Sequence, residues 1–258
     1  MTRRAVTYAS YLKVPELLAL QVERSEGPDG PEHDELLFIV IHQVYELWFK
    51  QLRHELRGVQ DALEVHDTDR ALHLLNRVLK ILKTLVAQVD VLETMTPLQF
   101  LSFRDRLDSA SGFQSAGFRL VEAMLGIRDP AAVRAQPDGS AARDELDAAQ
   151  REPTMWDAFL AYLASRGHPI PTDPAVPDER VQAALIAVYR GDPDAALVAE
   201  RLVDLDEGIQ EWRYRHVKMV ERTIGTKRGT GGSSGVEYLR ATLFRPAFPD
   251  LWEIRSVL

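Results

Sequence analysis

The sequence predicts an all-α protein, a single-domain helical bundle. Nearly every long segment repeats its apolar residues at three- and four-residue intervals, which is the spacing of an amphipathic helix. The period-two alternation of strands and turn pairs such as Asn-Gly are absent from the sequence. A chain of 258 residues with 45% hydrophobic side chains is long enough to bury a sizeable core. We therefore expect one helical domain over residues 1–258.

The first long helix is expected over residues 34–65. Its apolar stripe, at three- and four-residue spacing, includes Phe38, His42, Tyr45 and Phe49. From Leu36 to Phe49 the helix is apolar almost all round, which predicts that this end lies buried in the middle of the bundle. A second amphipathic helix over residues 70–95 ends before Pro97, because proline does not continue a helix.

Further helical patterns follow along the chain. They cover residues 98–107, 111–127, 155–167, 178–190 and 194–224. Residues 128–178 form a connector region in which short helices alternate with loops. Up to about residue 155 its composition of Ala, Asp, Arg and Pro predicts exposed material, and residues 168–177 are rich in proline.

Charge and cysteine content narrow the class of protein. The net charge of −8 argues against nucleic acid or an anionic membrane as the main partner. The chain has no cysteine, which excludes disulfides, thiolate catalysis and cysteine-ligated metal, and which fits a reducing cytoplasm. No stretch approaches the roughly 18 apolar residues of a membrane span. We expect a soluble, cytoplasmic protein with no nucleic-acid or membrane partner.

A glycine-rich segment, TKRGTGGSSG at residues 226–235, invites comparison with phosphate-binding loops. A dinucleotide fingerprint needs a third glycine where this chain has Ser234, and it follows a strand rather than a charged helix. A P-loop needs a lysine directly after a glycine, and no glycine of this segment is followed by lysine. Two interpretations remain: a flexible connector between helices, or a backbone that approaches a ligand closely, with Thr230 supplying a hydroxyl.

Two histidines lie on apolar helical stripes. His42 lies between Phe38 and Tyr45, and His216 follows Trp212 by one turn. A lone histidine on such a face is more often a satisfied core residue than a ligand. Two of them in a helical bundle also suit a haem pocket, because a single histidine can hold haem iron. A non-haem iron site is a further alternative, since Glu46 lies one turn after His42.

A third candidate feature is the segment FLSFRDRL. Phe100 and Arg104 share a helical face at i and i+4, and Leu107 lies a further turn along. A ring beside a guanidinium suits an aromatic compound that carries a carboxylate, which arginine would grip with two parallel hydrogen bonds. A surface arginine that covers a core phenylalanine is equally compatible with this spacing.

Long blocks of the sequence resemble one known family. These blocks are FIVIHQVYELWFKQLRHEL, FRDRLDSASGFQSAGFR and EWRYRHVKMVERTIGTKRGTGGSSGVEYLR, preceded by the opening segment YASYLKVPELLALQ. In this order they are similar to the signature blocks of the tryptophan 2,3-dioxygenase family. The resemblance covers the two ends and the middle, whereas residues 128–204 share only helical character.

The resemblance implies a b-type haem enzyme that assembles as an all-α homotetramer. Such an enzyme inserts both atoms of O2 across the indole C2–C3 bond of L-tryptophan to give N-formylkynurenine. Relatives on the same scaffold suggest an alternative, a haem monooxygenase that acts on a modified tryptophan. A haem-binding sensor and a haem-free interaction module are the non-enzymatic alternatives.

The resemblance also implies roles for individual residues around the substrate. His216 would be the proximal iron ligand, and His42 would be the distal histidine that accepts a hydrogen bond from the indole N–H. Arg104 would pair with the substrate carboxylate. The residues that would line the pocket for the ring are Phe38, Phe100 and Leu107. Because indole reacts as a π-nucleophile, we expect His42 to orient the substrate rather than to act as an obligatory base.

Further residues are assigned by the same resemblance. Those placed beside the haem are Ser111, Gly112 and Trp212. Thr230 would bind the ammonium and carboxylate ends of the substrate, which makes the glycine-rich segment an active-site lid. An N-terminal arm, residues 1–25, would reach the pocket of a neighbouring subunit through Tyr8, Tyr11 and Leu12. The chain departs from the family pattern at Asp108 and Ser109, where the edge of the pocket is expected to differ.

Overall fold

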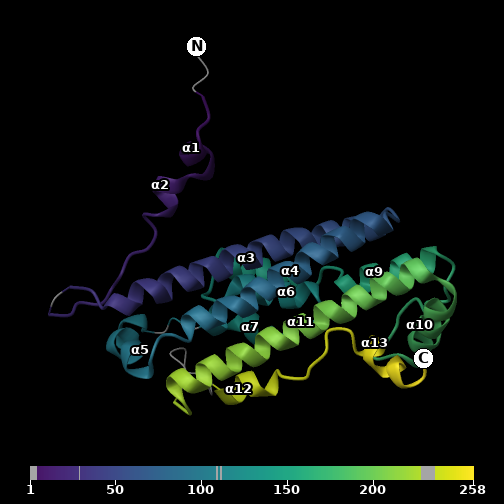
Figure 1. Ribbon diagram of the computed structural model, residues 1–258. Helices are drawn as coiled ribbons and strands as arrows, with labels where there is room; N and C mark the ends of the chain where they lie inside the picture. Colours follow the sequence, from purple (N-terminus) through teal and green to yellow (C-terminus); the bar gives the residue numbers. More distant parts are fainter. Residues whose placement is uncertain (1–4, 29, 109, 111, 228–235) are drawn as a thin grey trace.

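The computed structural model describes residues 5–28, 30–108, 110, 112–227 and 236–258 (Figure 1). Of the residues in these ranges 71% are helical, and none of them forms a strand. The predicted all-α class is therefore confirmed.

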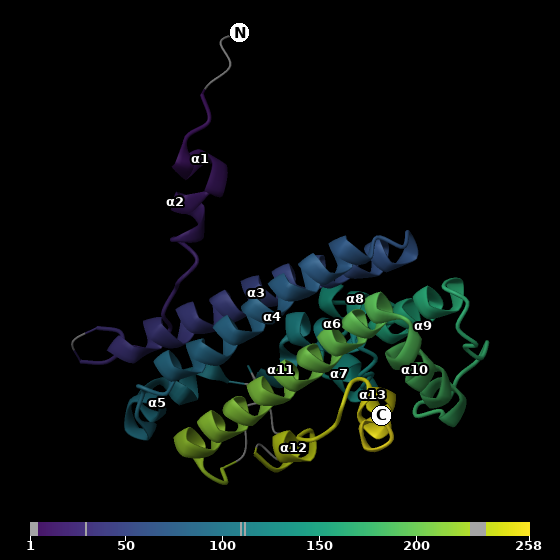
Figure 2. The same cartoon turned by 45° about the vertical axis from the view of Figure 1, so that its right-hand side comes forward.

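Three long helices form the body of the molecule. They are α3 (His33–Glu64), α4 (Thr68–Leu92) and α11 (Pro193–Ile224). Figures 1 and 2 show them side by side, with α4 packed against both α3 and α11. At 32 residues each, α3 and α11 are about 48 Å long at 1.5 Å per residue. The helices predicted over residues 34–65, 70–95 and 194–224 are thus confirmed.

Shorter elements complete the bundle. They are α5 (Pro97–Arg104), η1 (Asp105–Leu107), η2 (Gly112–Gln114), α6 (Ala116–Met124), α7 (Pro130–Arg134), α8 (Ala141–Ala149), α9 (Met155–Ser165), α10 (Glu179–Gly191), α12 (Val236–Ala241), α13 (Pro249–Glu253) and η3 (Ile254–Ser256). Helix α6 begins later than the predicted residue 111, because the Ser115 side chain caps it by accepting a hydrogen bond from Phe118 N.

One contiguous hydrophobic core joins the long helices to α5, α9, α10 and α13. Leu56 of α3, Leu75 of α4 and Leu202 of α11 are fully buried in it. Burial of a side chain of this size contributes about 1.5–3 kcal/mol each. The connector region is less exposed than predicted, because Leu146 and Ala149 of α8 are buried against α6.

The prediction for the first half of α3 is wrong in part. Ile41, Tyr45 and Phe49 are buried, but the opposite face leaves Leu36, Val40 and Leu47 exposed, Leu47 by 51%. The reason is that α3 lies at the outside of the bundle and packs on one face only, against α4, α5, α6 and α9. The single chain therefore has an apolar outer stripe on α3.

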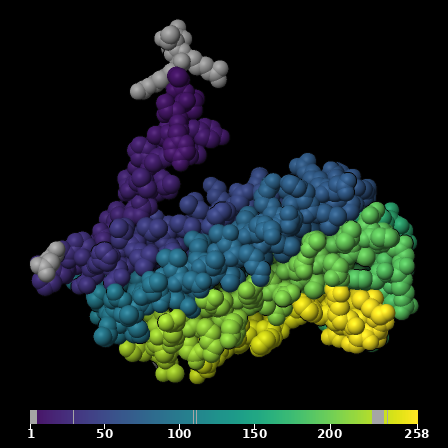
Figure 3. Space-filling model, viewed as in Figure 1, coloured from purple at the N-terminus to yellow at the C-terminus, as the bar shows by residue number. Residues whose placement is uncertain are grey.

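The N-terminal segment stands away from the body. Its helices α1 (Tyr8–Leu12) and α2 (Val14–Leu17) project from the start of α3, as the space-filling view shows (Figure 3). At its base the buried Glu35 carboxylate accepts hydrogen bonds from Arg24 N at 2.9 Å and Ser25 N at 2.8 Å. The described part of this arm is thus anchored at residues 24–25 and exposed beyond them.

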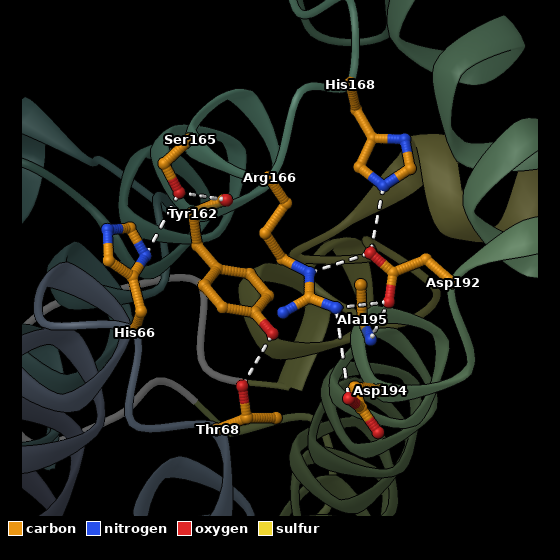
Figure 4. Close-up of polar contacts among 9 residues, drawn as sticks. All are labelled: His66, Thr68, Tyr162, Ser165, Arg166, His168, Asp192, Asp194 and Ala195. Atoms are coloured by element: carbon orange, nitrogen blue, oxygen red, sulfur yellow. Dashed lines mark hydrogen bonds and ion pairs between the residues drawn. The ribbon is translucent and has the colours of Figure 1, made fainter.

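At the opposite end of the bundle, Asp192 joins three segments (Figure 4). Its side chain caps α11 by accepting from Ala195 N, and it accepts two further hydrogen bonds from Arg166 at 2.6 and 2.7 Å. His168 Nε2 lies 3.1 Å from the same carboxylate. The Arg166 guanidinium holds the pKa of Asp192 well below its usual range.

In the part of the chain that the structure describes, none of the helices combines the length and apolar character that crossing a membrane would require.

We expect Asp192→Asn to lower the free energy of unfolding at pH 7 by about 2–3 kcal/mol, because charged hydrogen bonds to Arg166 are lost. A carboxyl whose pKa is lowered by folding stabilises the protein above its unfolded pKa, and that contribution is lost as the pH falls below about 4. The variant should therefore lose less stability than the parent between pH 5 and pH 3.

Urea unfolding across this pH range measures the effect. The matched control is Asp194→Asn, because Asp194 is 69% exposed and lies 3.9 Å from the same guanidinium. This control should change the stability by less than about 1 kcal/mol. Equal losses in the two variants would contradict the role assigned to Asp192.

Candidate functional site

A cavity of about 490 Å³ lies between α3, α5, α6, α11 and α12. This volume is in the range of small-molecule and cofactor sites. Its described lining residues are Phe38, His42, Tyr45, Glu46, Phe49, Leu92, Met95, Phe100, Arg104, Leu107, Ala110, Gly112, Phe113, Gln114, Ser115, Phe118, Arg119, Glu122, Trp212, Arg213, His216, Val217, Met219, Val220, Thr223, Ile224, Leu239 and Thr242. Both histidines predicted from the sequence therefore face one space.

His42 has a defined hydrogen-bonding state on the α3 wall. Its Nδ1 lies 2.7 Å from the backbone oxygen of Phe38, one turn earlier. A carbonyl oxygen only accepts, so Nδ1 carries the proton and donates it to this bond. Burial lowers the pKa of His42 below its ordinary value, against the opposing effect of this bond. The neutral ring therefore keeps Nε2 as a hydrogen-bond acceptor.

His216 lies on the α11 wall, and its ring is stacked on that of Trp212. The ring centroids are 5.2 Å apart and the planes differ by 4°. Burial, together with the nearby His42 and Arg119, lowers the pKa of His216 to about 4. At neutral pH its imidazole is thus uncharged, which is the form that binds a metal ion.

Packing from two other helices holds Trp212 in place. The Phe118 ring of α6 lies 4.5 Å from Trp212 between centroids, and the Phe49 ring of α3 lies 5.9 Å away, edge to face. Tyr45 also meets Trp212 edge to face at 6.2 Å. These contacts fix the rotamer of Trp212 and, through the stack, that of His216.

An aromatic cluster forms the wall near the start of α3. Phe38 lies 4.0 Å from the His42 ring, 5.8 Å from Phe100 and 5.5 Å from Phe103, all between ring centroids. Phe103 is fully buried behind Phe100, with an edge-to-face contact at 5.5 Å. This wall can pack against a flat aromatic molecule beside His42 Nε2.

Arg104 and Leu107 reach the same cavity from the end of α5 and from η1. The predicted helix over residues 98–107 is instead α5 followed by this short 3-10 turn. Both side chains nevertheless line the cavity, together with Phe100. The structure therefore brings a guanidinium, an aromatic wall and the His42 acceptor to one place.

A buried cluster of charges forms another part of the wall. The Glu122 carboxylate accepts from Arg119 Nη1 at 2.6 Å and from Arg213 Nη2 at 2.6 Å. All three residues are buried and line the cavity. Trp212 Nε1 and Arg213 Nε are buried donors with no hydrogen-bond partner among the described residues. Such donors suit a carboxylate on the molecule that fills the cavity.

Glu46 has a hydrogen-bond partner on α6. Its carboxylate accepts a hydrogen bond from Ser115 Oγ at 2.5 Å, at the start of α6. A Cβ on Gly117 would lie 2.3 Å from Glu46 Oε2, so glycine leaves room for this approach. In the described ranges no three residues of the types His, Asp or Glu form a group that could hold a metal ion. The non-haem triad of His42, Glu46 and a second histidine is not formed there.

The remaining predicted site residues have different outcomes. Gly112 lines the cavity, whereas Ser111 and Thr230 lie outside the described residues, as does the lid prediction for residues 228–235. Tyr8 and Tyr11 do not line the cavity of their own chain; they are 78% and 76% exposed on the arm, and Leu12 is 46% exposed.

The charged wall was not predicted from the sequence. Arg119 and Glu122 stand three residues apart in the apolar segment GFRLVEAML, and Arg213 directly follows Trp212. Charged residues in such an apolar helix are a usable signal, because a buried charge needs a partner. Glu122 pairs with Arg213 of α11, which lies 91 residues away in the sequence. This pairing depends on how α6 and α11 meet in the folded chain.

The cavity fits a haem group on the chemistry of its walls. The neutral imidazole of His216 can ligate iron, the buried N–H groups of Trp212 and Arg213 can donate hydrogen bonds to a propionate, and the aromatic side chains can contact the macrocycle. The described site does not supply the carboxylate ligands that non-haem iron requires.

We expect Ser115→Ala to lower the free energy of unfolding by about 1 kcal/mol, because it removes both the cap of α6 and the partner of Glu46. Thermal or urea unfolding of the protein without added ligand measures this change. Ser102→Ala is the matched control, since the Ser102 hydroxyl only donates to Gln99 O on an exposed face. The control should stay within about 0.5 kcal/mol, and an equal loss would contradict the capping role.

The family model and the similar proteins found by comparison carry the same description. The family model described as tryptophan 2,3-dioxygenase matches residues 1–166 and 175–258. A protein named tryptophan 2,3-dioxygenase from Anaeromyxobacter sp. (strain K) is 59% identical, over 98% of this chain and 97% of its own. Proteins of the same name from Herpetosiphon aurantiacus and Caulobacter vibrioides are 56% and 41% identical, over 99% and 98% of this chain and the same shares of their own.

The unmatched residues 167–174 fall in the proline-rich connector, and the residues that line the cavity all lie in the matched ranges. With the family model over most of its length and relatives above half identity, the chain belongs to the tryptophan 2,3-dioxygenase family.

Proposed function

We propose that this protein is a haem-dependent dioxygenase that inserts both atoms of O2 across the indole C2–C3 bond of L-tryptophan, with N-formylkynurenine as product. This is the first step of tryptophan catabolism by the kynurenine route. The observation that carries the proposal is one cavity that holds a neutral imidazole on each of two walls, with an aromatic cluster and Arg104 beside one of them. Family membership supports the same activity.

His216 is the proposed proximal ligand of a b-type haem, in the ferrous form when active. The stack on Trp212 sets the direction of its ring, and burial keeps the imidazole neutral. Trp212, Arg119 and Arg213 would hold the propionates, and Gly112 would lie beside the macrocycle, together with Ser111. Bound there, haem would supply the redox chemistry that oxygen insertion requires.

The opposite side of the cavity orients the substrate. The indole ring would pack against Phe38, Phe100 and Leu107, and its N–H would donate to His42 Nε2. Because Nδ1 is already bonded to Phe38 O, the ring is held in the tautomer that accepts this hydrogen bond. Arg104 would pair with the substrate carboxylate. Thr230 would bind the ammonium and carboxylate ends of the substrate, as its sequence block implies.

No strong general base is required of His42. Its lowered pKa leaves it able to accept a hydrogen bond at neutral pH, and the indole ring supplies the electrons for attack on oxygen. The chain's contribution is therefore orientation: the indole nitrogen is fixed at His42, and the carboxylate is fixed at Arg104. The aromatic side chains that line the cavity would help to exclude water around the bound substrate.

The assembly proposed for this chain is a homotetramer in which residues 1–25 of one subunit reach the pocket of another. Helices α1 and α2 have five and four residues, too few for stability in isolation. Their exposed apolar side chains, including Tyr8, Tyr11 and Leu12, and the outer stripe of α3 need partners. The main hydrophobic core, to which the long helices α3, α4 and α11 all contribute, supports the prediction of one domain. The lack of cysteine fits the cytoplasm.

The proposal predicts that the haem-reconstituted, reduced protein consumes L-tryptophan in an O2-dependent reaction. The product should have the mass of the substrate plus two oxygen atoms and the absorbance of a formylkynurenine. Mass spectrometry with ¹⁸O2 measures this directly, and incorporation of both labelled atoms is expected. His216→Ala should abolish the reaction by removing the iron ligand.

Other outcomes would each exclude the proposal in a distinct way. A product heavier by one oxygen would identify a monooxygenase, and haem uptake without loss of tryptophan would indicate a sensor. Failure of the wild-type protein to take up haem would exclude the cofactor. Normal haem binding and turnover in His216→Ala would show that the proximal assignment is wrong.

We expect His42→Ala to lower kcat/KM for L-tryptophan by about 5- to 150-fold without abolishing turnover. The loss of one hydrogen bond to a buried polar group costs about 1–3 kcal/mol, which corresponds to this range. Steady-state kinetics with L-tryptophan and with 1-methyl-L-tryptophan, which lacks the indole N–H, measure it. The variant should lose the preference for the unmethylated substrate; complete inactivity in both assays would indicate an obligatory base instead.

A further inference from the structure

The buried charges on the α6–α11 wall are arranged around one carboxylate. Each oxygen of Glu122 accepts from a different arginine, Oε2 from Arg119 and Oε1 from Arg213, both at 2.6 Å. The side chains of the three residues are between 4 and 8% exposed. Glu122 therefore bridges one residue of its own helix and one of the helix that carries His216.

This bridge determines the charge of the wall. Two buried guanidinium groups would repel each other strongly where the surroundings are apolar. The carboxylate between them pairs with both guanidinium groups and offsets one of the two positive charges. Glu122 thus allows both arginines to stay buried in the cavity wall with one net positive charge between them.

Arg213 connects this cluster to the C-terminal part of the chain. Its Nη1 donates to the backbone oxygen of Arg245 at 3.2 Å, while Nη2 is held by Glu122. Its Nε is buried and has no hydrogen-bond partner in the described part of the chain. The guanidinium is therefore fixed on two of its sides, and a third donor remains for an anionic group in the cavity.

We propose that Glu122 is a positioning residue that holds Arg119 and Arg213 beside the haem site and so sets the electrostatic potential at the iron. This inference rests on the proposed haem function and deepens it. Ferric haem carries one positive charge more than ferrous haem, so the Glu122 carboxylate favours the ferric state and each arginine favours the ferrous state.

The test is the midpoint potential of the haem-reconstituted full-length protein, measured by spectroelectrochemical titration at one pH. Glu122→Gln should raise the potential, because a negative charge is lost from the wall. Arg213→Gln should lower it, because a positive charge is lost. The double variant with both substitutions should return towards the wild-type value, since the net charge is restored.

Two further variants separate charge from structure. Arg213→Lys keeps the charge but not the paired geometry, so its potential should stay closer to the wild type than that of Arg213→Gln. Glu55→Gln is the matched control: Glu55 is a buried glutamate on α3 that pairs with Arg77 at 3.0 Å and does not line the cavity. It should change the stability without shifting the potential.

The outcomes are decisive in each case. The inference is overturned if the midpoint potential shifts in the same direction in Glu122→Gln and Arg213→Gln, or if it shifts in neither variant. Haem uptake by the wild type would leave the proposed function intact in that case. If Glu122→Gln fails to bind haem, the double variant should bind it again, because it no longer holds two arginines without a carboxylate between them. A double variant that folds, as judged by its helicity, but binds no haem also overturns the inference. Failure of the wild type to bind haem would instead reject the proposed function.

Discussion

The position of α11 is the constraint on which the site depends. This helix carries Trp212, Arg213 and His216 within five positions, and one face of it is buried against α4 over most of its length. Asp192 fixes its beginning, and the buried Asp206 carboxylate accepts hydrogen bonds from Ala247 N at 2.9 Å and Trp252 Nε1 at 2.9 Å. Because the helix is held along its length, His216 meets the cavity at a fixed place.

Burial also sets the chemistry of both histidines. An imidazole in an apolar wall is more costly to protonate, so His42 and His216 remain neutral at physiological pH. The two neutral rings nevertheless differ in their neighbours. His42 donates its Nδ1–H to the backbone oxygen of Phe38 and leaves Nε2 as a hydrogen-bond acceptor. The His216 ring is stacked on Trp212 and is available as a metal ligand.

The cavity combines this apolar environment with a small number of charges. Those in the described lining are Arg104, Arg119, Arg213, Glu46 and Glu122. Glu46 and Glu122 are engaged with Ser115 and with the buried arginines respectively. The buried ion-pair cluster thus lies on α6 and α11, and the cluster of Phe38, Phe100 and Phe103 lies on α3 and α5.

The sequence by itself determined the helical class, the three long helices and some of the residues that face the cavity, among them His42 and His216. Apolar periodicity is a local property, and it places Phe38, His42 and Tyr45 on one stripe without knowledge of the partner helix. Long blocks of unusual residues were sufficient to indicate the family. The spacing of Phe100, Arg104 and Leu107 predicted a shared face, although the helix ends at Arg104.

Only the tertiary structure decided which residues meet across helices. That Arg213 would share Glu122 with Arg119, and that Ser115 would bind Glu46 over a glycine, follows from how α6 packs against α3 and α11. The apolar outer face of α3 was taken for core, because hydrophobicity indicates that a face needs a partner and not whether that partner belongs to the same chain. Contacts between residues far apart in sequence depend on the packing of the whole bundle, and local patterns do not encode them.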